Sequence, residues 1–143
     1  MHARVNLIWF IALAGSLILI GVGAGADQLN EDRLAYIVTP SNGDTVSSPV
    51  KIIFGLRAPF GVAPAGVAMD NTGHHHLIID TDLPALDQAI PKDEKHRHFG
   101  GGQTEATIEL TPGEHTLQLL LGDFKHVPHT TPVFSEQITI TVK

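Results

Sequence analysis

Three consecutive histidines, residues 74–76, stand at the start of an apolar stretch and indicate a ligand site. If this segment is a β-strand, alternate side chains point to opposite faces, so His74 and His76 share a face about 7 Å apart. Two neutral imidazoles at this spacing can both reach one metal ion. His75 points the other way, toward the face of the apolar residues 77 and 79. The sequence leaves its role open, and a structural position at the edge of a core is one interpretation.

The elements that must position these histidines are predicted to be strands. Apolar and polar residues alternate with a period of two over 50–56 and 104–110, whereas residues 58–73 and 81–103 carry no periodicity and are predicted loops. No segment after residue 33 shows a helical period. Six strands are predicted: residues 34–38, 50–56, 74–80, 104–110, 115–121 and 136–142. Short strands separated by turn residues predict an all-β fold, an antiparallel two-sheet immunoglobulin-like sandwich over residues 34–143.

The predicted strand order brings other histidines close to the triplet. Consecutive strands run in opposite directions, so the loops before the third strand, before the fourth and after the fifth lie at one end of the sandwich. The six candidate metal ligands at this end are His74, His76, His96, His98, His126 and His129. His115 falls in the turn at the opposite end, where a ring reaching back to the backbone predicts a structural role.

The chemistry of these residues favours a transition metal. The chain has no cysteine, so the donors are imidazole nitrogens, which suit Cu(II), by intrinsic affinity, or Zn(II). Two other interpretations stay open. The histidines can hydrogen-bond the loop backbone and order the loops without a metal, or the same loops can form a metal-independent binding module for a cell-envelope ligand or partner protein.

No catalytic residue is predicted, and the chain is not expected to be an enzyme. Ser135 lacks a G-x-S-x-G context, and the three glycines at 100–102 lack the ending of a phosphate-binding loop.

The first residues predict export. Arg4 precedes 22 uncharged residues, 5–26, and Ala24 and Ala26 form a signal-peptidase pattern. Residues 1–26 are therefore predicted to be a signal peptide, with an uncleaved anchor as the alternative, followed by a polar linker at 27–33. The expected location is periplasmic or extracellular, with no membrane contact after cleavage. A formal net charge of −6 over 143 residues argues against nucleic-acid binding.

Four runs of residues carry a resemblance to a known family. They are GHHHLIIDTDLP at 73–84, HRHFGGGQTE at 96–105, PGEHTLQLLLGD at 112–123 and HVPH at 126–129. They resemble a family of small exported bacterial proteins catalogued as domain of unknown function 4399. The resemblance covers the chain from about Pro40 to Lys143 and implies an exported β-domain without an established activity.

Overall fold

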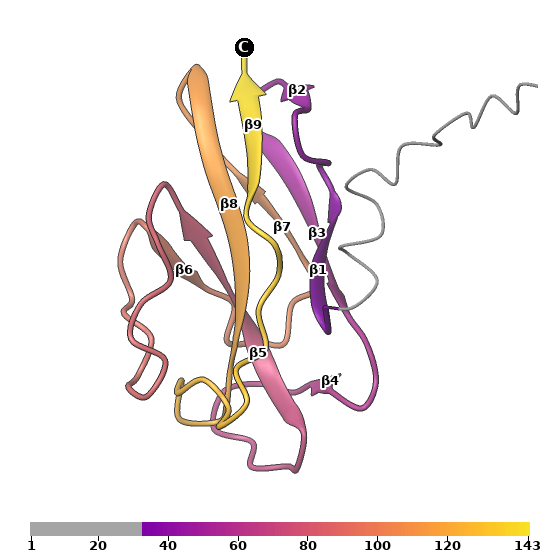
Figure 1. Ribbon diagram of the computed structural model, residues 1–143, viewed down its shortest axis with the longest axis vertical. Helices are drawn as coiled ribbons and strands as arrows, with labels where there is room; N and C mark the ends of the chain where they lie inside the picture. Colours follow the sequence, from indigo (N-terminus) through magenta and orange to yellow (C-terminus); the bar gives the residue numbers. More distant parts are fainter. Residues whose placement is uncertain (1–32) are drawn as a thin grey trace, which may run out of the picture.

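The computed structural model describes residues 33–143, which form an all-β fold of two sheets with no helix (Figure 1). Residues 1–26, predicted to be a signal peptide, lie outside the described residues, as does the linker except for Arg33. Within the described part, no helix is long and apolar enough to cross a membrane.

The first sheet has three strands in the order β1-β3-β7, all antiparallel. They are β1 (Ala35–Thr39), β3 (Val50–Leu56) and β7 (Glu105–Ile108). The alternation seen in the sequence places Val50, Ile52 and Phe54 on the buried face, whereas Lys51 on the other face is exposed and pairs with Glu105.

The second sheet has six strands in the order β2-β9-β8-β5-β4, with β6 also paired to β5. The strands are β2 (Thr45–Val46), β9 (Ile138–Val142), β8 (Gly113–Gly122), β5 (Thr72–Ile79), β4 (Gly61–Val62) and β6 (His96–His98). The two longest strands, β5 and β8, are antiparallel and central, and both are nearly continuous in buried residues. Such a run indicates that both faces of this strand pair are covered.

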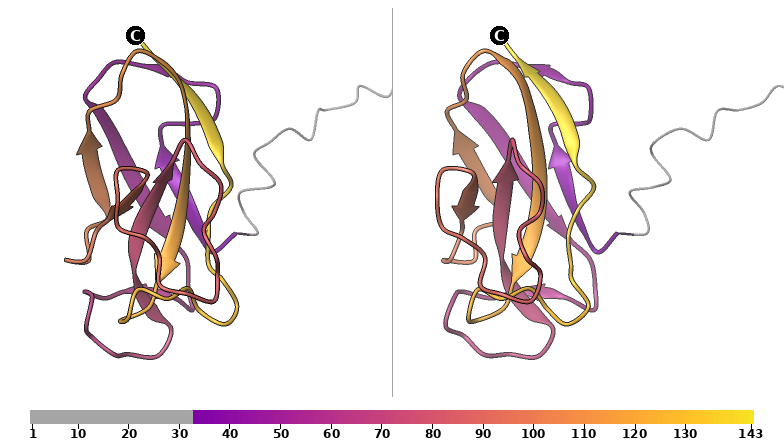
Figure 2. Two further views of the ribbon diagram at one scale, coloured as in Figure 1. Left: turned by 90° about the vertical axis from the view of Figure 1, so that its left-hand side faces the viewer. Right: turned by 60° about the vertical axis from the view of Figure 1, so that its left-hand side comes forward.

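The main core fills the space between the two sheets. Ile52 and Phe54 from β3 pack with Leu77 from β5, Leu119 from β8 and Ile140 from β9. A smaller cluster covers the outer face of the second sheet, where Ile78 and Leu120 meet Ile90 of the connection between β5 and β6. Figure 2 shows this connection in front of β5 and β8. Both the outer and the inner face of the β5–β8 pair are therefore buried.

The strands agree with the sequence prediction at all six segments, with ends shifted by a few residues. Three short strands, β2, β4 and β6, were not predicted. Two of them, β4 and β6, lie in stretches that were predicted to be loops. These strands have two or three residues, too few for a period of two to appear in the sequence.

Candidate metal centre

The alternation of β5 places His74 and His76 on the outer face of the second sheet. Their cross-strand partners in β8 are Gly122 and Leu120, and His76 also lies opposite His98 in β6. Opposite residues of antiparallel strands share a face, so His98 joins the pair from β5. A fourth ring, that of His126, comes from the loop after β8, at the lower end of Figure 1.

Four imidazoles meet at this point, and they are named the histidine cluster: His74, His76, His98 and His126. Five of the six distances between ring centroids are 4.8–5.1 Å, and the sixth, between His76 and His126, is 6.1 Å. Four imidazoles bound tetrahedrally to one ion at about 2.05 Å would place their centroids about 5.2 Å apart. The arrangement is thus close to that of a four-histidine site.

The nitrogen atoms support the same geometry. His74, His76 and His98 each offer one nitrogen, and these atoms lie within 4.8 Å of one another. Nε2 of His126 lies 3.1 Å from Nε2 of His98, close to the separation of about 3.4 Å between two tetrahedral ligands of zinc. His74, His76 and His98 can therefore hold a metal ion. The ring of His126 lies farther from that of His76 than the other rings do, so His126 is the most loosely placed of the four.

The hydrogen bonds of the cluster are incomplete. Among residues 33–143, Nδ1 and Nε2 of His74 and Nδ1 of His76 are buried and have no hydrogen-bond partner. His74 and His76 are 0% and 1% exposed. An unpaired buried polar group costs about 1–3 kcal/mol, so folded proteins rarely leave several of them together. A bound cation would pair with one nitrogen of each ring.

The cluster favours uncharged imidazoles. Burial first, then repulsion from His126 and His98, lowers the pKa of His74 to about 4, although Asp123 opposes the shift. Burial, followed by repulsion from His74, His98 and His126, lowers the pKa of His76 to about 3. Burial and the charges of His126 and Lys92 also lower the pKa of His98. At neutral pH these rings are uncharged, which is the form that binds metals. The Nε2 atoms of His98 and His126 share a hydrogen bond with each other.

Two glycines make room for the rings. A Cβ at Gly100 would lie 2.3 Å from the ring of His98, and a Cβ at Gly122 would lie 2.8 Å from the ring of His76. Carbon atoms do not approach so closely, so any larger residue at either position would displace a ring of the cluster. Neither glycine was predicted from the sequence to belong to the site, although Gly100 follows His98 by two residues.

Asp123 orders the loop that carries His126. Its Oδ1 accepts hydrogen bonds from the backbone N–H groups of Lys125 and Val127, and its backbone carbonyl accepts from His126 N–H at 2.9 Å. This turn holds His126 at a left-handed φ of 68°, which is uncommon for residues other than glycine. The carbonyl of His126 also accepts from Ile90 N–H, so the loop is tied to the covering connection.

The other predicted ligands lie outside the cluster. Nδ1 of His96 is 2.8 Å from Oδ1 of Asp93, with which it forms an ion pair when protonated. The ring of His129 packs edge-on against Phe60 at 4.9 Å, and its Nε2 has no partner among the described residues. The structure brings together four of the six predicted ligands and does not bring His96 and His129 to the same point.

His75 and His115 both have structural surroundings, and the sequence predicted this role for His115. His75 faces the main core, 1% exposed, with its ring centroid 5.2 Å from that of Phe54. His115 lies on β8 at the far end from the cluster. Its Nε2 is 2.8 Å from the carbonyl oxygen of Thr111, and its Nδ1 is 2.7 Å from Oδ2 of Asp80.

The fold and the site define an all-β domain of two sheets that gathers imidazoles on a covered sheet face. The family model described as Domain of unknown function (DUF4399) matches residues 52–143, and the chain belongs to this family. No match is found among curated proteins or among solved structures.

Proposed function

We propose that this protein is an exported metal-binding domain that holds one divalent transition metal ion, Cu(II) or Zn(II), in the histidine cluster. The observation that carries the proposal is His74, a fully buried imidazole with two unpaired nitrogens, surrounded by three further rings at 4.8–5.0 Å. Neutral nitrogen donors without thiolate suit both ions, and Cu(II) binds more tightly in the intrinsic order of affinities.

The proposal assigns binding and no catalysis. A site closed by four protein ligands serves a structural or storage role, because catalytic zinc sites keep a position open for water or substrate. His126, on its loop, supplies the ligand that closes the site. The immunoglobulin-like strand arrangement and the export of residues 27–143 belong to the same proposal, supported by the two-sheet fold and by the signal pattern at 1–26.

The test uses the tag-free protein, stripped of metal, and titration calorimetry with Zn(II) and Cu(II). We expect one ion per chain, and His98→Gln should weaken binding by more than about 100-fold, since a direct ligand counts for at least as much as its supporting groups. His96→Gln is the matched control, because His96 lies two residues away on β6 but outside the cluster. The absence of saturable binding, or equal losses in the two variants, would refute the proposal.

Metal binding should also stabilise the fold. An ion present at about 100 times its dissociation constant adds about 2.7 kcal/mol to the free energy of unfolding, visible as a higher melting temperature. Export is tested separately by mass spectrometry of the protein isolated from cells, which should begin at Asp27. A retained residue 1 would instead indicate an anchor.

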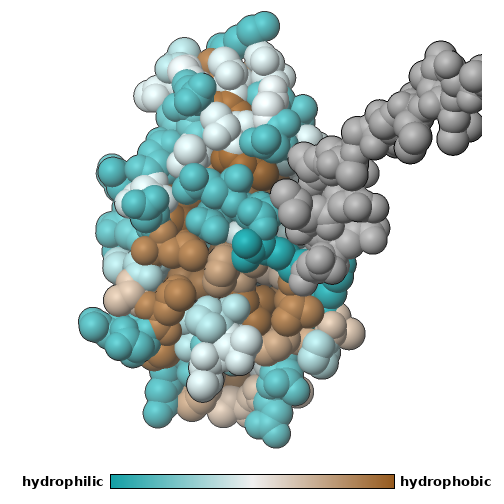
Figure 3. All heavy atoms as spheres, in the orientation of Figure 1, coloured by the Kyte–Doolittle hydropathy of each residue, from teal (hydrophilic) through white to brown (hydrophobic). Residues whose placement is uncertain are grey.

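The alternative, a metal-independent module of the cell envelope, has weaker support. Of the phenylalanines beside the loops, Phe60 packs against His129, Phe99 against Phe54, and Phe134 joins the outer cluster. Phe124 is 37% exposed. Hydrophobic atoms do gather over the lower half of the face in Figure 3. Binding to isolated envelope material that survives alanine replacement of His74 and His76 would favour this alternative.

A further inference from the structure

A cavity of about 340 Å³ lies beside β6, next to the histidine cluster but separate from its centre. β6 is an edge strand among the described residues, since it pairs with β5 alone. Side chains from both faces of β6 line the cavity, and Ile108 of β7 in the other sheet completes the wall. The cavity therefore opens at the side of the molecule, between the edges of the two sheets.

The cavity is lined by two cations that have no anionic partner. Lys92 and Arg97 both line it, and neither forms an ion pair or hydrogen bond with residues 33–143. The acidic group of the cavity, Asp93, is already engaged. Its Oδ1 accepts hydrogen bonds from the backbone N–H groups of Lys95 and His96 and contacts the His96 ring.

This local charge contrasts with that of the whole protein, whose formal net charge is −6. Two unpaired cations at one cavity of an acidic protein indicate selection of an anion, because guanidinium and ammonium groups bind carboxylate and phosphate with strong, charge-assisted hydrogen bonds.

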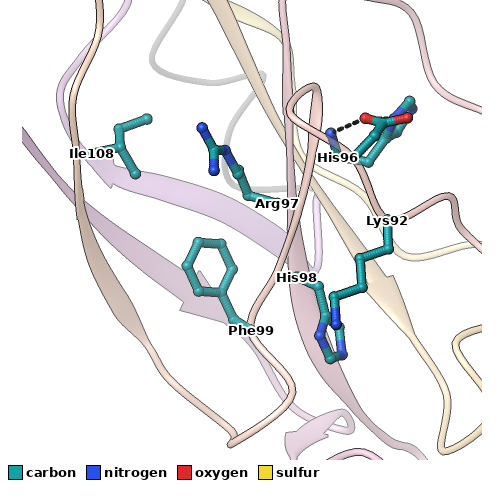
Figure 4. Close-up of a pocket in the computed structure, with 7 residues that line it drawn as sticks. Lys92, His96, Arg97, His98, Phe99 and Ile108 are labelled. Atoms are coloured by element: carbon teal, nitrogen blue, oxygen red, sulfur yellow. Dashed lines mark hydrogen bonds and ion pairs between the residues drawn. The ribbon is translucent and has the colours of Figure 1, made fainter.

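Phe99 and Ile108 form the apolar part of the wall, and His96 and His98 complete it. Figure 4 shows the guanidinium of Arg97 above the ring of Phe99, with Ile108 facing both, while the Lys92 side chain extends alongside the His98 ring. A volume of this size matches small-molecule pockets, which combine apolar walls with a few polar groups that orient the ligand.

We infer that this cavity binds a small organic anion, a carboxylate or phosphate with an apolar part, with Arg97 pairing with the anionic group and Phe99 and Ile108 contacting the apolar part. Lys92, beside His98 on the other side of β6, adds positive charge to the cavity. The anion site does not require a metal. It adjoins the metal centre through His98, whose ring takes part in the histidine cluster and whose residue also lines the cavity. Ligand binding and metal binding should therefore influence each other by way of this side chain.

The test uses metal-free protein and three aromatic probes of similar size: benzoate, phenyl phosphate and uncharged benzyl alcohol. Nuclear magnetic resonance follows the backbone amides of residues 96–99 during each titration. We expect saturable shifts with a dissociation constant on the order of 1 mM for at least one charged probe, and none for benzyl alcohol. Saturation by either anion supports the inference, and the order of the two identifies carboxylate or phosphate as the preferred group.

Arg97→Gln should weaken anion binding about tenfold, the effect of one charge-assisted hydrogen bond, and Lys92→Gln should weaken it less, because it removes only a nearby charge. Lys51→Gln is the control, because it removes the same charge from the first sheet, where Lys51 pairs with Glu105. Equal weakening by Lys51→Gln, binding of benzyl alcohol as strong as that of the anions, or no saturation by either anion would overturn the inference.

Failure of the anion site and failure of the metal site are distinguishable. The anion titrations contain no metal, and metal binding is measured in Arg97→Gln and Lys92→Gln without any anion probe. If both variants keep their metal affinity and bind benzoate or phenyl phosphate more weakly, the two sites are separate. If the metal-free protein binds neither anion, the inference fails whatever the metal result.

Discussion

The two ends of the β5–β8 strand pair each hold a buried histidine, and they differ in how the ring nitrogens are paired. At one end, both nitrogens of His115 have partners, the carboxylate of Asp80 and the carbonyl of Thr111. At the other end, both nitrogens of His74 are buried without any partner in residues 33–143. The same two strands therefore supply one imidazole whose nitrogens are paired within the described residues and one whose nitrogens are not.

The partners also set the proton affinity at each end. Burial lowers the pKa of His115, but the hydrogen bonds to Asp80 and Thr111 and the charge of Asp80 outweigh it, so the pKa is raised. Burial and neighbouring imidazoles lower the pKa of His74 to about 4. A buried histidine with a carboxylate partner stabilises the fold as a cation, whereas one among other histidines must stay neutral. This difference separates His115 from His74. His75 shares the lowered pKa and the unpaired nitrogens of His74, and it differs from His74 in facing Phe54 in the main core.

Low pH should have the largest effect, because it changes the contributions of the two ends to folding stability in opposite directions. The unfolded chain protonates His74, His75 and His76 near pH 6.5, but the folded chain does so only near pH 3 to 4. Between these pH values protons bind the unfolded chain preferentially, so the metal-free fold loses stability as the pH falls from 6.5 toward 4. An imidazole whose pKa falls from 6.5 to about 4 accounts for about 3 kcal/mol. The stabilisation from His115 is fully present below pH 6.5 and is lost as pH rises through its raised pKa.

Urea denaturation of the metal-free protein at pH 7 and pH 4.5 measures this effect. The free energy of unfolding should fall by more than about 3 kcal/mol. Equal stability at the two pH values would contradict the neutral state assigned to the cluster.

Gly100→Ala should disturb the cluster end alone. The added Cβ would lie 2.3 Å from the His98 ring and push this ligand out of place, so metal affinity should fall about 10- to 100-fold, as it does when a supporting group is lost. Gly101→Ala is the matched neighbour, since its Cβ would meet only the flexible side chain of Gln103, at 3.1 Å. Calorimetry of both variants checks this, and similar affinities would show that Gly100 does not position His98.

His115→Ala should disturb only the opposite end. It removes two partly buried hydrogen bonds and leaves the carbonyl of Thr111 without its ring partner, so the free energy of unfolding should fall by about 2 kcal/mol. Metal affinity should be unchanged, since the ring lies at the far end of β8. Urea denaturation and metal titration of the same preparation test both statements, and a matching loss of metal affinity would contradict the separation of the two ends.

His75→Leu should have the smallest effect and sharpens the comparison within the triplet. His75 contacts Phe54 in the main core with both nitrogens unpaired, so a leucine of similar size removes an unsatisfied polar group. We expect a gain of about 1 kcal/mol in the free energy of unfolding, and unchanged metal affinity. A loss of metal binding would place His75 in the ligand set.

Much of the fold was predictable from the sequence, because strand alternation and turn residues are local signals. The six predicted strands all occur, as does the opposite facing of His75 and its neighbours. β6 was missed because three residues show no period, although this strand sets His98 directly opposite His76. The immunoglobulin-like class, export and metal binding remain predictions.

The sequence by itself determined that His74 and His76 share one face of a strand, because strand parity follows from local pattern. It predicted His96, His98, His126 and His129 on loops at the same end, whereas the structure places His96 and His98 on β6. Only the tertiary structure decided that His98 and His126 meet the pair while His96 turns to Asp93 and His129 to Phe60. The reason is that a loop residue's position depends on contacts distant in sequence. The hydrogen bond from Ile90 N–H to the His126 carbonyl and the space that Gly122 leaves for the His76 ring are such contacts, and no periodicity encodes them.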